Sequence, residues 1–197
     1  FVSIASHEFR TPLSTILTSV SLIGKYNDNS LLDKRNKHIE RIKGSVKNLT
    51  DILNDFLSLE KLEAGKVEIR NDTINFKQFC EEITEEMQSV SKPGQQIILT
   101  YAGSQEAYAD KTLMRHILVN LINNAIKYSP ENSKVDFEVD NSDEISIKIK
   151  DYGMGIPLED QQHLFERFFR AGNVTAIQGT GLGLNIVQRY VNKLKGS

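Results

Sequence analysis

A histidine near the start of the chain is placed where it could act as a nucleophile. Apolar residues recur at steps of three and four from Phe9 to Ile23, which predicts a helix that packs through one apolar seam. At about 100° per residue, His7 lies almost opposite Phe9, on a polar stripe of this helix. A neutral imidazole in water has one unprotonated ring nitrogen that can attack an electrophile. An exposed histidine without a task would have the same position, so the neighbours must decide between the two interpretations.

Three neighbours set His7 apart from an ordinary surface histidine. Glu8 points about 100° away from it, whereas Thr11, one turn further on, lies directly beside it. Pro12 inside a helix removes a hydrogen bond and clashes with an earlier carbonyl, which costs about 3 kcal/mol. We therefore expect a local kink that serves a function.

A second polar stripe follows the N-cap residue Asp110. On the helix predicted there, Asn120, Asn124 and Lys127 fall within an arc of about 60°. Asparagine oxygens are neutral ligands suited to a hard cation such as Mg²⁺, and a lysine one turn further on can meet phosphate charge. A solvated helix face is the alternative, although such a face more often carries Glu and Lys.

The strand predicted at 145–151 places a carboxylate on an unexpected face. Side chains alternate along a strand, so Asp151 shares the face of Ile145, Ile147 and Ile149, which we expect to point at the core. A carboxylate there needs a hydrogen-bond donor, and the exocyclic amine of adenine is a fitting one. The alternative is an aspartate that only starts a turn with Gly153.

Residues 179–184, GTGLGL, are rich in glycine and open the last predicted helix. The backbone N–H groups of such a loop can bind phosphate at the positive end of a helix. The loop is not the dinucleotide fingerprint, because its third glycine comes one residue early and no strand precedes it, and no GK[ST] follows for a P-loop.

The stretch 1–13, FVSIASHEFRTPL, resembles the H-box of the sensor histidine kinases of two-component systems. This resemblance implies that His7 is autophosphorylated from ATP and that Glu8 is its general base. It also implies that Glu8 and Thr11 form the Glu-x-x-Thr pattern linked to dephosphorylation of the partner protein.

Two further stretches resemble nucleotide-binding boxes of the same family. Residues 115–130, RHILVNLINNAIKYSP, resemble the N-box, and residues 151–156, DYGMGI, resemble the G1 box. The N-box resemblance implies that Asn124 holds Mg²⁺ and that the nucleotide is contacted by Asn120, Lys127 and Tyr128. The G1 resemblance implies that Asp151 reads adenine within a pattern completed by Gly153, Gly155 and Ile156.

The remaining boxes follow in the family's order. Residues 164–170, LFERFFR, resemble the F-box, and this resemblance implies that Arg170 approaches the phosphates. Residues 171–178 are similar to the mobile ATP lid. Residues 179–184 match the G2 box, which adds these nucleotide-binding residues: Thr180, Gly181, Leu182, Gly183 and Leu184.

Composition excludes several other classes of protein. Of 197 residues, 25% are charged and 39% apolar, and the net charge of −2 gives no electrostatic reason to expect nucleic-acid binding. The single cysteine, Cys80, lies on an apolar stripe and is expected to be a reduced core thiol. No apolar run approaches the ~20 residues that span a bilayer. We expect a cytoplasmic protein, or the cytoplasmic part of a membrane-bound sensor attached through segments not present in this sequence.

The elements that position these residues predict two domains. Residues 1–65 form an all-α helical hairpin, whose second helix carries an apolar seam from Ile39 to Phe56 and ends at the capping residue Gly65. One hairpin cannot cover both seams, so we expect a homodimer whose two hairpins make a four-helix bundle. Residues 66–74 are the expected linker.

Residues 75–197 alternate between helical and strand periodicity, and the resemblance implies an α/β sandwich of the Bergerat (GHKL) ATPase fold. We expect a mixed sheet covered on one face by helices, with a hairpin across 135–149 and a short aromatic helix at 164–170. The last strands that such domains usually carry are missing before Ser197.

The function expected is ATP-dependent autophosphorylation of His7, with Mg²⁺, and transfer of the phosphoryl group to an aspartate of a response-regulator receiver domain. Phosphatase activity toward that regulator is a further expectation. Two alternatives are a GHKL-fold ATPase without histidine chemistry and a catalytically silent dimeric signalling adaptor.

Overall fold

The computed structural model describes residues 2–26, 31–174, 177 and 179–197, with side chains from residue 8 onward. These residues fall into two compact units, 1–66 and 67–197, each of which has its own packing. The loop expected at 27–30 and the lid residues 175, 176 and 178 lie outside the described residues. None of the helices in the described ranges is both long enough and apolar enough to cross a membrane.

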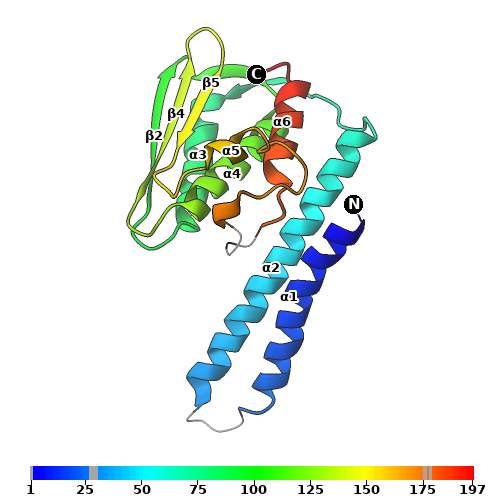
Figure 1. Cartoon of the computed structure of the whole chain (residues 1–197). Coiled ribbons are helices and arrows are strands. Elements are labelled where there is room, and N and C mark those ends of the chain that lie inside the picture. The colour runs from blue at the N-terminus through cyan, green and yellow to red at the C-terminus, as the bar shows by residue number, and fades with distance from the viewer. Residues whose placement is uncertain (1, 27–30, 175–176, 178) are drawn as a thin grey trace. The chain divides into compact units, whose positions relative to one another are not determined.

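The first unit is a hairpin of two helices, α1 (Val2–Ile23) and α2 (Leu32–Glu63), which lie side by side (Figure 1). The predicted apolar seam of α2 is only partly buried in this hairpin, with Ile39, Ile42, Leu49 and Phe56 half-buried. The fully buried residues of α2 follow one heptad position beside this seam, at His38, Ser45, Ile52 and Leu59. Within this hairpin Val46 and Leu53 of the predicted seam stay exposed.

Helix α2 ends as its sequence predicts. Gly65 adopts a left-handed conformation, with φ of 65°, directly after the C-cap residue Ala64. The N–H of Lys66 donates to the carbonyl of Lys61 at 3.0 Å, which closes a Schellman motif. Glycine is favoured here because it reaches positive φ without a Cβ clash.

The second unit contains two small sheets. Strands β1 (Asp72–Asn75) and β3 (Glu106–Ala109) pair antiparallel. Strands β2 (Gln96–Gly103), β4 (Lys134–Asn141) and β5 (Ser146–Lys150) form the main sheet in the order β2-β4-β5. The β2-β4 pair is parallel and the β4-β5 pair is antiparallel, so the sheet is mixed, as expected.

Helices α3 (Phe76–Ser89), α4 (Lys111–Tyr128) and α6 (Gly183–Lys193) complete this unit. In Figure 1 they lie on one side of the main sheet, which leaves its other face open within this unit. The core lies between the two layers, and its fully buried side chains include Phe76, Phe79, Ile83, Leu118, Ile122, Val135, Phe137 and Leu182. The predicted α/β sandwich is therefore confirmed, and so is the helical unit that precedes it.

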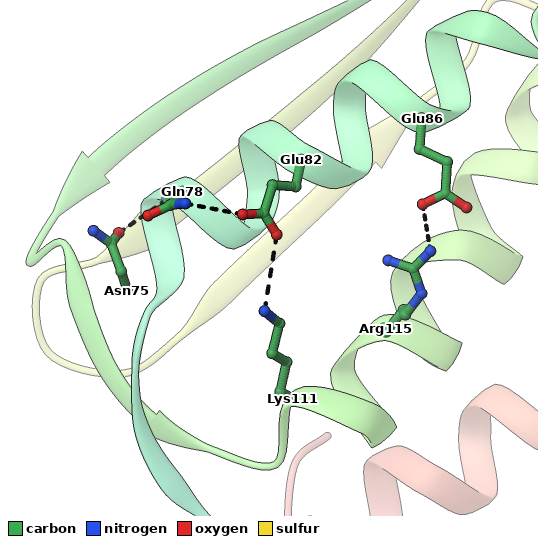
Figure 2. Close-up of polar contacts among 6 residues, drawn as sticks. All are labelled: Asn75, Gln78, Glu82, Glu86, Lys111 and Arg115. Atoms are coloured by element: carbon green, nitrogen blue, oxygen red, sulfur yellow. Dashed lines mark hydrogen bonds and ion pairs between the residues drawn. The ribbon is translucent and has the colours of Figure 1, made fainter.

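Both ends of α4 are fixed by polar groups. At its start Asp110 Oδ1 accepts the N–H of Leu113 at 2.9 Å, which is the predicted N-cap. Figure 2 shows the ion pairs that join its first turns to α3, Lys111 with Glu82 and Arg115 with Glu86.

At the other end of α4, the buried Gln95 and the half-buried Lys92 reach from the loop before β2. Lys92 Nζ donates to the carbonyls of Lys127 and Ser129 at 2.8 and 2.6 Å. Gln95 Nε2 donates to the carbonyls of Ile126 and Pro130 at 3.1 and 2.9 Å. A cation and an amide thus satisfy carbonyls that a helix end leaves without intrahelical partners.

Two expectations about the elements are wrong in detail. The expected linker at 66–74 ends earlier, because β1 begins at Asp72 and pairs with β3. The expected aromatic helix at 164–170 is absent, and a short helix, α5 (Leu158–Gln161), precedes a series of turns. The backbone of Phe168 has a φ of 62°, which a right-handed helix excludes, and its N–H donates to the carbonyl of Gly181 at 3.0 Å.

Candidate nucleotide site and phosphoacceptor helix

The predicted phosphoacceptor His7 lies inside α1, but its side chain is outside the described residues. The next turn is described: Glu8 is half-buried, Thr11 is exposed, and Pro12 is buried inside the helix. The polar stripe of α1 thus continues C-terminal to His7 as expected.

A groove of about 460 Å³ lies between α1 and α2 along this stripe. Most residues that line it are polar, and they include Arg10 and Thr11 of α1 with His38 and Arg41 of α2. His38 is nearly fully buried, and its Nδ1 lies 3.4 Å from Ser19 Oγ. Arg10 belongs to the polar stripe predicted for α1, but sequence reasoning missed His38 and Arg41, because nothing in the spacing of α2 indicates which of its faces meets α1.

In the second unit, the predicted polar stripe of α4 forms a connected row. Asn124 Nδ2 donates to Asn120 Oδ1 at 3.3 Å, and Lys127 Nζ lies 5.1 Å from the centre of the Tyr128 ring. All four side chains are half-buried. Burial raises the pKa of the Tyr128 phenol, and the nearby positive charge of Arg170 partly offsets this effect.

Close approaches at glycines bring the predicted boxes together around this row. A Cβ on Gly183 would lie 2.7 Å from Asn120 Oδ1, and one on Gly179 would lie 2.5 Å from Lys127 Nζ. A Cβ on Gly153 would lie 2.4 Å from the carbonyl oxygen of Tyr128. The stretches expected as N-box, G1 box and G2 box therefore meet at the C-terminal half of α4.

The expected F-box joins the same cluster through backbone contacts. A Cβ on Gly181 would lie 2.6 Å from the carbonyl carbon of Phe168, and Gly181 has a φ of 67°. Only glycine fits such an approach without displacing backbone. Asn185 of α6 adds a bond of 2.6 Å from its Nδ2 to the carbonyl of Phe165.

The expectation that Asp151 is buried in the core is wrong. Its carboxylate is exposed, because β5 ends at Lys150 and even Ile147 and Ile149 are only half-buried. Asp151 Oδ1 accepts the N–H of Gly153 at 2.9 Å, which is the turn weighed as the alternative. An exposed carboxylate oriented by a turn remains available to a ligand.

The residues that follow Asp151 form an open loop. Gly155 has a φ of 67°, and no atom lies within 4 Å of the place where its Cβ would be. Ile156 is exposed. Asn173 Nδ2 donates to the carbonyl of Gly155 at 3.0 Å, so a residue of the predicted lid contacts the G1 stretch.

The predicted phosphate-binding groups are engaged with the protein itself. Arg170 donates through Nη2 to the carbonyl of Val174 at 2.9 Å and to that of Ile177. Thr180 Oγ1 accepts the N–H of Leu182 at 3.1 Å. The Leu182 side chain belongs to the core, and Leu184 is half-buried, so any contact of these two leucines with phosphate must use their backbone.

Within the described residues, no group of three or more His, Cys, Asp or Glu side chains gathers as a metal site. The donors near α4 are instead the amide oxygens of Asn120 and Asn124. This small, neutral donor set fits Mg²⁺, which keeps several waters and is usually held by one or two protein groups together with substrate phosphates.

Two family models match the chain. Residues 1–65 match the His Kinase A (phospho-acceptor) domain, and residues 109–197 match the model described as histidine kinase-, DNA gyrase B- and HSP90-like ATPase. The chain belongs to the histidine kinases. An ATPase of this fold alone would not account for the match over residues 1–65.

Individual histidine kinases resemble the chain over nearly all of its length. The signal transduction histidine-protein kinase BarA of Escherichia coli K12 is 32% identical over the whole chain, which spans 22% of BarA. The structure of the histidine kinase AdeS of Acinetobacter baumannii is 25% identical, with a TM-score of 0.65 over 94% of this chain and 86% of AdeS.

A third histidine kinase, full-length ShkA, has been solved in complex with AMPPNP. It is 25% identical, with a TM-score of 0.69 over 98% of this chain and 40% of ShkA. The chain thus combines a helical hairpin that matches the phospho-acceptor model with a separate unit in which the four stretches expected as nucleotide boxes meet at α4.

Proposed function

We propose that this protein transfers the γ-phosphoryl group of ATP to His7 and then to an aspartate of a response-regulator receiver domain. The observation that carries the proposal is the convergence of residues 120–128, 151–156, 165–170 and 179–185 at one end of α4. Membership of the histidine kinase family supports it. BarA and AdeS are named histidine kinases, and ShkA was solved with AMPPNP.

In the proposed site, Asp151 accepts a hydrogen bond from the adenine amine, because its carboxylate is exposed and already oriented by the Gly153 turn. Lys127 and Arg170 supply positive charge for the phosphates, and Asn120 and Tyr128 contact the nucleotide from the same row. The backbone of residues 180–184 closes over the phosphates, while Gly153, Gly155 and Ile156 shape the loop beneath the base.

Asn124 is the proposed protein ligand of Mg²⁺, since its amide belongs to the neutral donor set beside Lys127. When bound, Mg²⁺ would neutralise phosphate charge and orient the chain of phosphates. The contribution of the protein is to place Asn120, Lys127 and Arg170 around a fixed helix end.

At the phosphoacceptor, one nitrogen of the neutral His7 ring attacks the γ-phosphorus in line with the bond to ADP. The new N–P bond forms as that P–O bond breaks, and ADP leaves with the electron pair. Glu8 takes the proton from the other ring nitrogen, so the phosphohistidine is left without a ring charge. Glu8 with Thr11 is also proposed to support removal of the phosphoryl group from the regulator.

The proposed partners follow from the exposed surface of the hairpin. Leu13 and Val20 of α1 and Val46 and Leu53 of α2 are exposed by about half. A second copy would cover them in a four-helix bundle, so we propose a homodimer. The polar groove near Thr11 is the proposed docking place of the receiver domain, and the cytoplasm, which supplies ATP, is the proposed compartment.

The proposed division of labour is a phosphoacceptor unit up to residue 65 and an ATP-binding unit whose first strand, β1, begins at Asp72. Residues 66–71, which precede that strand, would serve as a hinge that lets His7 meet and leave the nucleotide.

The deciding experiment follows phosphate from radiolabelled ATP into purified protein with Mg²⁺. We expect an acid-labile, base-stable label that His7→Gln abolishes while nucleotide binding survives. His163→Gln, at a half-buried histidine of the other unit that pairs with Glu166, is the control and keeps its label. Label retained in His7→Gln would refute the phosphoacceptor. Nucleotide binding without any label in the wild type would point to a silent adaptor.

A further inference from the structure

A tyrosine within the G1 stretch is held on the face of the main sheet that the helices leave open. Tyr152 follows Asp151 directly, and its hydroxyl donates to Asp136 Oδ2 at 2.7 Å. Asp136 lies on β4 between the buried Val135 and Phe137, so its side chain belongs to the opposite face of the strand from theirs. The side chains of Asp151 and Tyr152, although adjacent in sequence, therefore belong to different faces of the main sheet.

Two lysines hold the same ring. Lys134 Nζ of β4 lies 4.9 Å from the ring centre of Tyr152, and Lys150 Nζ of β5 lies 5.1 Å from it. Lys134 also pairs with Asp136 Oδ1 at 3.1 Å, and Asp136 lies opposite Lys150 in the strand register. The ring is thus fixed by one hydrogen bond and two cations from neighbouring strands.

The charges around the ring support each other. The hydrogen bond from Tyr152 is the main cause that lowers the pKa of Asp136, and the hydrogen bond to Asp136 is the main cause that raises the pKa of Lys134. Both groups are therefore charged at neutral pH, and the cluster is intact where the kinase would work.

The G1 turn is restrained from its other side by the end of α4. Gly153 lies so close to the carbonyl oxygen of Tyr128 that a Cβ would be 2.4 Å from it. The N–H of Gly153 in turn binds Asp151 Oδ1 at 2.9 Å. Asp151, itself exposed, is therefore flanked by a residue tied to the sheet and a residue tied to α4.

We propose that Tyr152, clamped by Asp136, Lys134 and Lys150, is a positioning residue that orients Asp151 toward the adenine base. This proposal rests on the function proposed above for Asp151. The Tyr152 hydroxyl itself binds Asp136 on the open face of the sheet, so its effect on the nucleotide must pass through the backbone it shares with Asp151 and Gly153. The consequence is that nucleotide affinity and base selectivity depend on side chains that never touch the ligand.

The experiment compares binding of ATP and GTP, with Mg²⁺, to Tyr152→Leu, Tyr152→Phe and Asp136→Asn proteins. We expect Tyr152→Leu to weaken ATP binding about fivefold or more and to reduce the preference for ATP over GTP, because a loosened carboxylate reads the adenine amine less well. Tyr152→Phe keeps the ring between the lysines and should fall between Tyr152→Leu and the wild type. The rate of autophosphorylation at saturating ATP should change little.

Asp136→Asn distinguishes an indirect effect of Tyr152, through the position of Asp151, from a direct contact of Tyr152 with the nucleotide. Asp136 belongs to the open face of the sheet, so a loss of affinity in this variant requires transmission through Tyr152. The double variant Tyr152→Phe/Asp136→Asn should be no weaker than the worse single variant, since one substitution removes and the other weakens the same hydrogen bond between Tyr152 and Asp136. Tyr108→Leu, the same change at an exposed tyrosine of β3, is the matched control and should bind as the wild type does.

Unchanged affinity and selectivity in both Tyr152→Leu and Asp136→Asn would overturn the proposal. If Asp151→Asn loses ATP while those variants do not, the positioning role fails and the proposed nucleotide site stands. If Asp151→Asn also binds ATP normally, the proposed role of Asp151 itself fails. Should Tyr152→Leu not fold, as judged by circular dichroism, Tyr152→Phe and Asp136→Asn decide alone.

Discussion

At the scale of single residues, the site relies on groups whose chemistry is set by neighbours rather than by burial. Asp151 is exposed, yet its Oδ1 is held by the N–H of Gly153. Lys127 lies over Tyr128 and beside Gly179. These contacts fix the directions in which the two side chains point. Their polar atoms stay accessible to water, so a ligand can displace that water and bind.

Asp151→Asn tests the proposed reading of adenine. The amide keeps the size of the carboxylate but loses its charge, and a hydrogen bond to a charged group contributes about 1.5–3 kcal/mol. We expect nucleotide affinity to fall between about tenfold and a hundredfold, measured by calorimetry with ADP. Asp143→Asn, in the exposed turn between β4 and β5, is the control. Equal affinity in the two variants would exclude the assigned role.

The chemistry of the Cys80 thiol is set mainly by its burial. Desolvation raises the pKa of its thiol from 9.0 to about 12, with a smaller contribution from Glu81. At pH 8 the native protein should hold about 1000-fold less thiolate than the unfolded chain, so a disulfide reagent should react far more slowly without urea than with it.

The same shift gives a direction for stability against pH. The native thiol keeps its proton where the unfolded one loses it, so this contribution to stability is intact below pH 9.0 and is lost as pH rises toward about 12. Denaturant unfolding at several pH values above 9 should show this loss of stability. Cys80→Ala should reduce the slope of the free energy of unfolding against pH. A rapid native reaction at pH 8 would contradict the buried position.

At the scale of elements, α4 contributes buried residues to the core and polar residues to the proposed site. Its N-terminus is capped by Asp110, and Figure 2 shows the ion pairs that link its first turns to α3. Its C-terminal carbonyls are bound by Lys92 and Gln95. The last turn carries Lys127 and Tyr128, so the cap that ends the helix also holds two proposed nucleotide contacts.

Lys92→Met should expose the importance of this C-terminal cap. The variant leaves the carbonyls of Lys127 and Ser129 without their charged donor, which we expect to lower the free energy of unfolding by about 1–2 kcal/mol. Nucleotide affinity should fall a few-fold because the last turn of α4 loosens. Thermal melts and ADP titration measure both effects.

Lys148→Met is the matched control for this cap. Lys148 is exposed on β5, so the same loss of charge there should change stability by less than about 0.5 kcal/mol. Equal effects of the two substitutions would mean that Lys92 acts only through net charge.

At the scale of the whole molecule, the two helices of the hairpin leave some of their apolar side chains exposed to solvent. The inner face of α2 is partly polar, with His38 and Ser45 buried beside Ile52 and Leu59. Leu13 and Val20 of the seam predicted for α1, and Val46 and Leu53 of the seam predicted for α2, stay about half exposed, which is why we propose a second copy.

Val20→Asp tests the homodimer. Val20 and Val90 are each 53% exposed, but Val20 is on α1 and Val90 is at the end of α3. A carboxylate in the proposed bundle would remove about 1.5 kcal/mol or more per copy, so the dimer should dissociate at about a hundredfold higher concentration or more. Light scattering over a dilution series measures this, and Val90→Asp should leave the oligomeric state unchanged. A monomeric wild type would refute the dimer.

Much of this protein follows from sequence alone, because its signals are local. Helical periodicity placed α1, α2, α4 and α6, Asp110 and Gly65 marked helix ends through capping chemistry, and alternation gave β4 and β5. The family likewise follows from five motifs in order. Such features depend on residues within a few positions of each other.

Tertiary structure decided what depends on partners far apart in the chain. The inner face of α2, the extension of β1 into the expected linker and the turns that replace an aromatic helix all result from contacts with distant segments. The exposure of Asp151 and the clamp on Tyr152 depend on where β5 ends against β4. Periodicity assigns a face to each side chain, but only packing determines what that face meets.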